Sequence, residues 1–244
     1  MKENKKQGIK FYHKSHKYKY GKDELTSVTR FIGKFFPEFE AKELAKKLAS
    51  FSWAKKQGKT MRTFLKEWKE TAEVGTKIHE YMENYCKNTM QECDFEEILA
   101  NKEYKVQRGI EWLDKFLESK KKYILLPEAL VYDIPNKLAG TVDLIVVEEN
   151  EDPVDKPYIT LIDWKSNTNF TKNYDNQNGK EPISHLPNTK LSKYTLQLSM
   201  YAYMLEQQGE AYVKELLLVE LGDEKVKVHK VDYLKKEVED MIKW

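Results

Sequence analysis

The pattern of apolar and polar residues divides the chain into a mainly helical first part and a second part rich in strands. Apolar residues at helical spacing predict helices over residues 28–36, 38–51, 60–88 and 96–120, after a short two-stranded ribbon over residues 9–20. The second part predicts, in order, strands over residues 123–133, 138–147 and 158–165, a helix over 191–208, strands over 211–221 and 225–231, and a helix over 233–244. This order predicts an α/β (α+β) fold with one central mixed sheet flanked by helices.

Local signals fix several of these boundaries. Ser27 is placed to cap the first helix and Pro37 to end it, and Thr60 is placed to open the long third helix. Gly75 predicts a break within that helix. Residues 167–190 are polar and rich in Asn, Lys and Pro, so we expect a mobile loop there.

Three charged residues interrupt the apolar strands in the middle of the chain. Asp143 lies in the run 141–147, and Asp163 and Lys165 end the run 158–165. Alternate residues of a strand share a face, so Asp163 and Lys165 project to the same side, and a hairpin between the two runs would bring Asp143 to them. Charges inside apolar strands are costly unless they are paired or bind metal.

Two carboxylates at one point of a sheet suit Mg²⁺ or Mn²⁺, which prefer oxygen ligands and keep several waters. A lysine beside such an ion can position an attacking water, or help to deprotonate it, and offset the charge of a phosphate. The predicted chemistry is hydrolysis of a phosphodiester. A surface salt bridge at a strand end is the simpler explanation of Asp163 and Lys165 taken alone.

Two helical groups accompany these residues. Tyr194, Gln197 and Tyr201 are spaced by three and four residues and so share one helical face. An aromatic core stripe would explain the tyrosines but not Gln197, which needs a hydrogen-bond partner if buried. His79 follows Gly75 in the long helix; without other observations it reads as a structural or surface histidine.

Composition narrows the class of protein. The chain has 244 residues, 40% of them hydrophobic, and a net charge of +2, so we expect a single globular domain over residues 1–244. Residues 1–120 form its mainly helical part and residues 121–244 its α/β core. Residues 1–22 carry eight lysines and one acid, interleaved with aromatics, which suits a nucleic-acid backbone or, equally, a solvated terminus.

No apolar run is long enough for a membrane span and no secretory signal is evident, so we expect no membrane partner and a cytoplasmic location, in a bacterial or phage-infected cell. Cys86 and Cys93 are the two cysteines, too few for a four-cysteine zinc or iron–sulfur site. Gly58-Lys59-Thr60 resembles the end of a phosphate-binding loop, but no strand precedes it, and we exclude ATP binding.

Four motifs in order carry a resemblance to a known family. Gly75-x-x-x-His79, Gly140-x-x-Asp143, Asp163-x-Lys165 and Gln197-x-x-x-Tyr201 resemble the RecB-type branch of the PD-(D/E)XK nuclease superfamily. The layout is most similar to stand-alone, phage-type exonucleases and to the mitochondrial genome maintenance exonuclease. Members with an iron–sulfur cluster use four cysteines that this chain lacks.

The resemblance implies a restriction-endonuclease-like core and a role for each matching residue. Lys165 would be the catalytic lysine, Gln197 would brace it or a phosphate, and Tyr201 would bond alongside Gln197. The metal ligands would be Asp143, Asp163, the backbone carbonyl of Trp164, His79 and, in the first core strand, Glu128. Substrate-binding residues would be Lys193, Tyr194 and Ser166.

The leading hypothesis is a Mg²⁺- or Mn²⁺-dependent deoxyribonuclease, an exonuclease acting on DNA ends or single strands, with DNA threaded between the N-terminal helices and the sheet and residues 167–190 as a gate. Two alternatives remain. One is a structure- or sequence-specific endonuclease of the same fold, and the other is a non-catalytic relative that binds DNA or a protein.

Overall fold

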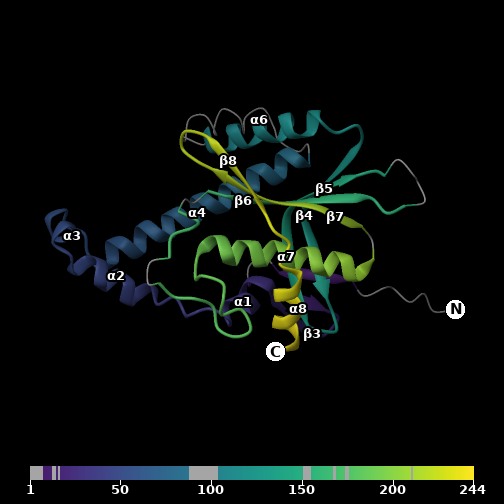
Figure 1. Ribbon diagram of the computed structural model, residues 1–244. Helices are drawn as coiled ribbons and strands as arrows, with labels where there is room; N and C mark the ends of the chain where they lie inside the picture. Colours follow the sequence, from purple (N-terminus) through teal and green to yellow (C-terminus); the bar gives the residue numbers. More distant parts are fainter. Residues whose placement is uncertain are drawn as a thin grey trace.

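An eight-stranded mixed sheet lies between two layers of helices (Figure 1). The computed structural model describes residues 8–12, 15, 17–87, 104–150, 155–166, 169–173, 176–209 and 211–244. The strands are β1 (Ile9–Tyr12), β2 (Lys17–Tyr20), β3 (Asp23–Ser27), β4 (Tyr123–Asp133), β5 (Leu138–Glu148), β6 (Tyr158–Lys165), β7 (Tyr212–Leu221) and β8 (Val226–Val231). The helices are α1 (Val28–Gly33), α2 (Ala41–Ser50), α3 (Ser52–Lys56), α4 (Met61–Cys86), α6 (Tyr104–Glu118), α7 (Lys190–Gln208) and α8 (Lys235–Lys243). The predicted α/β class, with a mixed sheet flanked by helices, is confirmed.

The long strand β5 organises the sheet because it pairs with three neighbours. It is antiparallel to β4 along its whole length and antiparallel to β6 along its second half. At its first end β5 pairs instead with β3, in parallel. Strand β6 continues in parallel to β7, and β7 pairs with β8. The strands β3 and β6 therefore share one side of β5, and β5 passes from one to the other.

Helices cover both faces of the sheet, and alternate residues of β7 show the division. Leu216 and Leu218 pack in the core formed with α1, α7 and α8, whereas Leu217 and Val219 pack in the core formed with α4 and α6. This alternation follows from the period of two residues along a strand. Each face of the sheet is therefore buried under its own helical layer.

The first helices extend away from the sheet. Helices α2 and α3 pack against the first half of α4 around a small separate core of Ala45, Ala54 and Phe64. We call residues 39–68, which comprise α2, α3 and the start of α4, the helical arm. In Figure 1 the arm lies at the left, beyond the edge of the sheet.

Capping residues act as predicted. The Ser27 hydroxyl accepts from the backbone N–H of Arg30 and opens α1, which ends three residues earlier than expected, at Gly33. The Thr60 hydroxyl accepts from the Thr63 N–H and opens α4. Helix α4 runs unbroken through Gly75, so the predicted break there is wrong; a glycine in a helix costs only about 1 kcal/mol, which packing outweighs.

Other boundaries were missed or displaced. Strand β3 and helix α3 are elements that the sequence did not predict, and α2 begins at Ala41 rather than at residue 38. The ribbon turn at Lys14 and the residues 88–103 lie outside the described part of the chain. So does Cys93, whereas Cys86 is a free, half-buried thiol.

The segment between β6 and α7 has little regular structure, as expected, but its described residues are anchored. Phe170 and Ile183 are buried in the core beside α7. The Lys180 N–H donates to the Phe35 carbonyl, and Asn178 forms a β-bridge with Pro187. In its described residues this connection is therefore a packed segment.

Among the described residues, no helix combines the length and the apolar character that crossing a bilayer requires.

Candidate functional site

The site forms where β5 and β6 separate. Their ladder ends with the pair Leu144 and Ile162, and the next residues along the two strands are Asp143 and Asp163. The backbone N–H of Trp164 donates to Asp143 Oδ2 at 2.8 Å. A side-chain carboxylate thus takes the place of the ladder's carbonyl, and the two strands diverge around a pair of acids. We call this point the fork.

Lys165 lies on the same strand as Asp163 and meets it. The Lys165 Nζ atom is 2.5 Å from Asp163 Oδ2, and the two side chains are only 12% and 3% exposed. Their contact is therefore a close ion pair, and the Asp163 Oδ2 atom is shielded from solvent. The Tyr194 ring of α7 covers the ammonium, with its centroid 4.5 Å from Nζ.

Two further side chains reach Asp143 from neighbouring elements. His79 of α4 places Nδ1 3.3 Å from Asp143 Oδ2. Glu128 of β4 stands opposite Asp143 in register, but the two residues form no ladder pair, and Glu128 has a φ of 49°. A left-handed glutamate following Pro127 is a strained position for an ordinary residue. With this backbone conformation, the Glu128 carboxylate lies beside His79 and Asp143.

The electrostatics of the fork reflect crowded acids in a buried place. Burial, with the charges of Asp143 and Glu83 beside it, raises the pKa of Glu128 to about 7. Burial likewise raises the pKa of Asp163 to about 6, although Lys165 opposes the shift. Burial would also raise the pKa of Asp143, but His79, Lys165 and the Trp164 N–H together hold it below its usual value.

For the two basic groups, Lys165 and His79, burial lowers the pKa and the neighbouring acids raise it. Burial would lower the pKa of Lys165, but the charges of Asp163 and Asp143 outweigh it and raise that pKa. Burial would lower the pKa of His79 as well, and Asp143 raises it above its ordinary value. Lys165 is therefore an ammonium in this arrangement, and it serves as a hydrogen-bond donor and a positive charge.

These residues fit a divalent cation. His79, Glu128 and Asp143 each offer a ligand atom, all within 4.8 Å of one another, and Asp163 lies at the same fork with its Oδ2 paired to Lys165. Oxygen donors with one imidazole suit Mg²⁺ or Mn²⁺. Bound metal would offset the repulsion that now raises the pKa of Glu128 and Asp163.

The predicted face of α7 closes the site from one side. Gln197 Nε2 donates to the Tyr201 hydroxyl at 3.1 Å, which supplies the partner that a half-buried amide requires. The Tyr201 ring lies against Gly140 of β5, where an added Cβ would stand 2.3 Å from Cε1. Gly140 is required because the backbone and the ring approach so closely.

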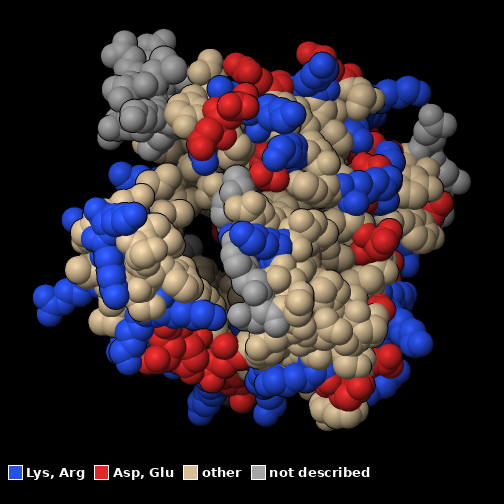
Figure 2. Space-filling view, turned by 60° about the vertical axis from the view of Figure 1, so that its left-hand side comes forward, with Lys and Arg blue, Asp and Glu red and all other residues tan. Residues whose placement is uncertain are grey.

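Two hollows lie beside the fork. The larger, of about 550 Å³, is lined by α1, the segment after it, and α7, including Lys193, Tyr194 and Gln197. The smaller, of about 350 Å³, lies between α4 and α6 and includes Ser166 and Lys105. Figure 2, which brings the helical arm forward, shows the surface hollowed beside a lobe rich in lysine.

The structure thus gathers most of the residues singled out from the sequence. Asp143, Asp163, Lys165, His79 and Glu128 meet at the fork. Gln197, Tyr201 and Tyr194 meet along α7, and Lys193 and Ser166 line the two separate hollows. The Trp164 indole is buried against Trp112, so only its backbone reaches the fork.

Sequence reasoning missed three cations of the larger hollow. They are Arg30, Lys34 and Lys180, which come from α1 and from the packed segment before α7. No spacing rule connects residues 30 and 180, because a tertiary contact brings them together. The polar patterning of these segments gave no signal for them.

Comparison with known proteins places this geometry in a family. The family model described as the PD-(D/E)XK nuclease superfamily matches residues 48–244. No curated protein gives a significant match to the chain. Among solved structures, one described as "Crystal structure of SSO0001" is 13% identical, with a TM-score of 0.25, over 68% of this chain and 74% of that one. The match to the family model spans the fork together with α4, α6, α7 and α8, and the chain belongs to the PD-(D/E)XK nuclease superfamily.

Proposed function

We propose that the protein is a Mg²⁺- or Mn²⁺-dependent deoxyribonuclease that acts on DNA ends or single strands as an exonuclease. Family membership implies metal-dependent nuclease activity. The observation that carries the proposal is the meeting of Asp143, Asp163 and Lys165 at the fork, with His79 and Glu128 beside Asp143.

The fork's acids would hold the ion. Asp143, Asp163, the Trp164 carbonyl, His79 and Glu128 are its proposed ligands. Bound there, a divalent ion lowers the pKa of a water and offsets charge on a phosphate. The strained backbone of Glu128 supports this assignment, because such strain persists where the surrounding structure fixes a functional group.

Lys165 would act directly on the reacting atoms. Its buried ammonium can donate hydrogen bonds to the attacking water and to a phosphate oxygen. In the reaction the water oxygen bonds to phosphorus, one bridging P–O bond breaks, and the proton of the water passes to solvent or to the leaving oxygen. Tyr194 limits the positions of Nζ by covering it, and Gln197, oriented by Tyr201, would contact the phosphate.

A preference for ends is supported by the shape of the site. Tyr194 and Gln197 line the larger hollow, which continues toward the helical arm through Phe39, and the hollow carries four lysine or arginine side chains. A strand reaching Lys165 through this hollow would pass between the N-terminal helices and the sheet. The motifs around His79 and Gln197 favour the RecB-type branch, with its phage-type and mitochondrial members.

The test is digestion of end-labelled single-stranded, double-stranded and circular DNA with Mg²⁺ or Mn²⁺. We expect labelled linear DNA to be shortened and circles to resist, and the label gives the polarity. Lys165→Ala should abolish cleavage while circular dichroism stays native. Lys230→Ala, which breaks an exposed ion pair with Glu215 on the same sheet, is the matched control.

Cleaved circles would establish the endonuclease alternative. Full cleavage by Lys165→Ala would contradict the assignment of the fork, and binding of DNA without any shortening under either metal would establish the non-catalytic alternative.

A further inference from the structure

The helical arm is strongly basic, although the chain as a whole is nearly neutral. Its residues 39–68 contain seven lysines and one arginine against three acids, Glu40, Glu43 and Glu67, while the complete chain carries a net charge of only +2. Most of the arm's positive charge therefore has no local acid to balance it.

Five of these cations have no ion-pair partner within the described part of the chain. Three others are paired: Lys46 with Glu43, Lys59 with Glu67, and Lys66 with Glu70. The unpaired and exposed ones are Lys42, Lys47, Lys55, Lys56 and Arg62. Exposed cations kept apart from acids are available to an external anion.

Aromatic rings are interleaved with these cations. Phe39, Phe51 and Trp53 are 66%, 42% and 44% exposed. Phe39 and Trp53 are joined through a row of ring contacts: Phe39 to Trp68 at 6.3 Å, Trp68 to Phe64 at 6.3 Å, and Phe64 to Trp53 at 5.9 Å. Large exposed rings among lysines form a stacking surface for unpaired bases.

The row of rings also leads back to the site. Phe39 begins it and lines the larger hollow together with Lys193 and Tyr194, and Tyr194 covers Lys165. From Phe64 to His79 along α4 the axial distance is about 22 Å at 1.5 Å per residue. That span corresponds to about six nucleotides of a strand at 3.4 Å each.

We propose that the helical arm is a second nucleic-acid site, which binds an unpaired stretch of the substrate strand about six nucleotides from the scissile bond. The cations would contact phosphates, and Phe51, Trp53 and Phe39 would stack on bases. The assignment rests on the proposed function for the identity of the ligand. A single strand is favoured over a duplex because the rings can stack only on bases that are unpaired.

The test measures binding apart from cleavage. In EDTA, fluorescence anisotropy would follow a five-nucleotide strand, a twenty-nucleotide strand and a blunt twenty-base-pair duplex. The triple variant Lys47→Gln, Lys55→Gln, Lys56→Gln should weaken binding of the long strand by tenfold or more and lower its salt slope by about 2. Phe51→Ala should weaken binding of the long strand by about 5- to 150-fold, which is the effect of losing one stacked base.

Matched controls come from the opposite end of the chain. Lys236→Gln with Lys243→Gln removes exposed charge from α8, and Trp244→Ala removes a ring that is 76% exposed. Neither should change binding of the long strand. A five-nucleotide strand held at the fork is too short to reach the arm, so its cleavage under Mn²⁺ should be equal in all variants.

Two results would overturn the proposal: unchanged binding of the long strand by the triple variant, or an equal loss on the blunt duplex. Cleavage of the five-nucleotide strand under Mn²⁺ separates this failure from that of the proposed function. If the triple variant cleaves it like the parent, the fork stands whatever the arm does. If the unmodified protein cleaves none of the DNA, the proposed function fails. The binding measured in EDTA still tests the role of the arm in that case.

Discussion

The fork and the helical arm differ in how their charged side chains are placed. At the fork the charged side chains are buried or half-buried and lie against one another, as Lys165 does with Asp163 and His79 with Asp143. On the arm the lysines are exposed, and several, such as Lys55 and Lys56, have no acid beside them within the described residues. Both regions are rich in charge, but only the fork fixes where each charge lies.

The difference agrees with the role that we propose for each region. Bond cleavage depends on groups held within a fraction of an ångström of their working positions, which requires packing and partners on every side. Holding a strand requires only many similar contacts to phosphates and bases, and flexible exposed side chains provide these. The fork is therefore part of the main core, whereas the arm rests on a small core of its own.

The largest effect should come from Asp143→Asn. The amide keeps an acceptor for the Trp164 N–H but loses the charge that pairs with His79. We expect cleavage to fall on the order of 10³-fold, while binding of the long strand in EDTA, which depends on the arm, is unchanged. Glu215→Gln, on strand β7 of the same sheet and paired with Lys230, is the control and should cleave normally.

Cleavage rates and anisotropy on the same preparations give both numbers. A parallel loss of cleavage and of binding would show that the two regions are not separable.

An intermediate effect should come from Phe64→Ala in the arm. Phe64 is 5% exposed and packs against Ala45 and Ala54, so truncation leaves a cavity that costs about 3–5 kcal/mol within this small core. We expect hydrogen exchange to accelerate in α2 and α3 while β5 and β6 stay protected. Cleavage of the five-nucleotide strand should persist.

Leu198→Ala is the contrasting variant, because Leu198 of α7 is fully buried in the main core. It should lower the free energy of global unfolding by about 2–5 kcal/mol, and so affect both regions. Loss of protection throughout the sheet in Phe64→Ala would mean that the arm and the sheet unfold as one unit.

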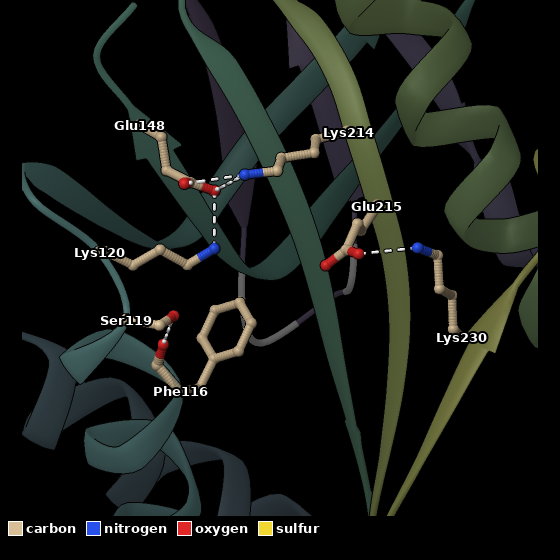
Figure 3. Close-up of polar contacts among 7 residues, drawn as sticks. All are labelled: Phe116, Ser119, Lys120, Glu148, Lys214, Glu215 and Lys230. Atoms are coloured by element: carbon tan, nitrogen blue, oxygen red, sulfur yellow. Dashed lines mark hydrogen bonds and ion pairs between the residues drawn. The ribbon is translucent and has the colours of Figure 1, made fainter.

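The smallest effect concerns an ion-pair cluster that belongs to neither region. Figure 3 shows the Glu148 carboxylate of β5 between Lys120, which follows α6, and Lys214 of β7, at 2.8 and 3.0 Å. Burial would raise the pKa of Glu148, but its two lysines hold that pKa below its usual value. The ionised carboxylate therefore stabilises the folded state above its unfolded pKa of about 4.3.

This contribution is lost as the pH falls through the lower, folded-state pKa. Glu148→Gln should accordingly be less stable than the parent near neutral pH, by about 1 kcal/mol or less, and the gap should close in acid. Urea denaturation across that pH range measures it. A gap that does not change with pH would show that the carboxylate's charge is not what stabilises this corner, and cleavage should not change in either case.

The sequence predicted the core of this molecule better than its periphery. The strands over residues 123–133 and 158–165 were predicted to the residue, because continuous apolar runs end there at turn signals. The acids, the lysine and the face of α7 were predicted because side-chain period and spacing decide which residues share a face. The parallel pairing of β3 with β5 could not be predicted, since short polar strands carry no partner signal.

The arm's role was missed for a related reason. The sequence predicted no role for its exposed lysines, and the structure was needed to show which of them meet an acid. The left-handed backbone of Glu128 could likewise not be predicted, although Pro127 before it indicates an irregular strand.

The contact between Tyr201 and Gly140 fixes how α7 is rotated about its axis and where it lies along the sheet. Tyr201 rests on β5 at Gly140, three residues, or about 10 Å, before Asp143. Tyr194 lies seven residues, or about 10.5 Å, from Tyr201 along the helix, and there it meets Lys165. The distance from Tyr201 to Tyr194 along α7 therefore nearly equals the distance from Gly140 to Asp143 along β5, and both are measured from the contact between Tyr201 and Gly140. A single residue inserted between Gln197 and Tyr201 would shift the first part of α7 by about 1.5 Å and rotate it by about 100° relative to Tyr201. Gln197 and Tyr194 would then turn away from the fork, while every residue of the fork would stay in place.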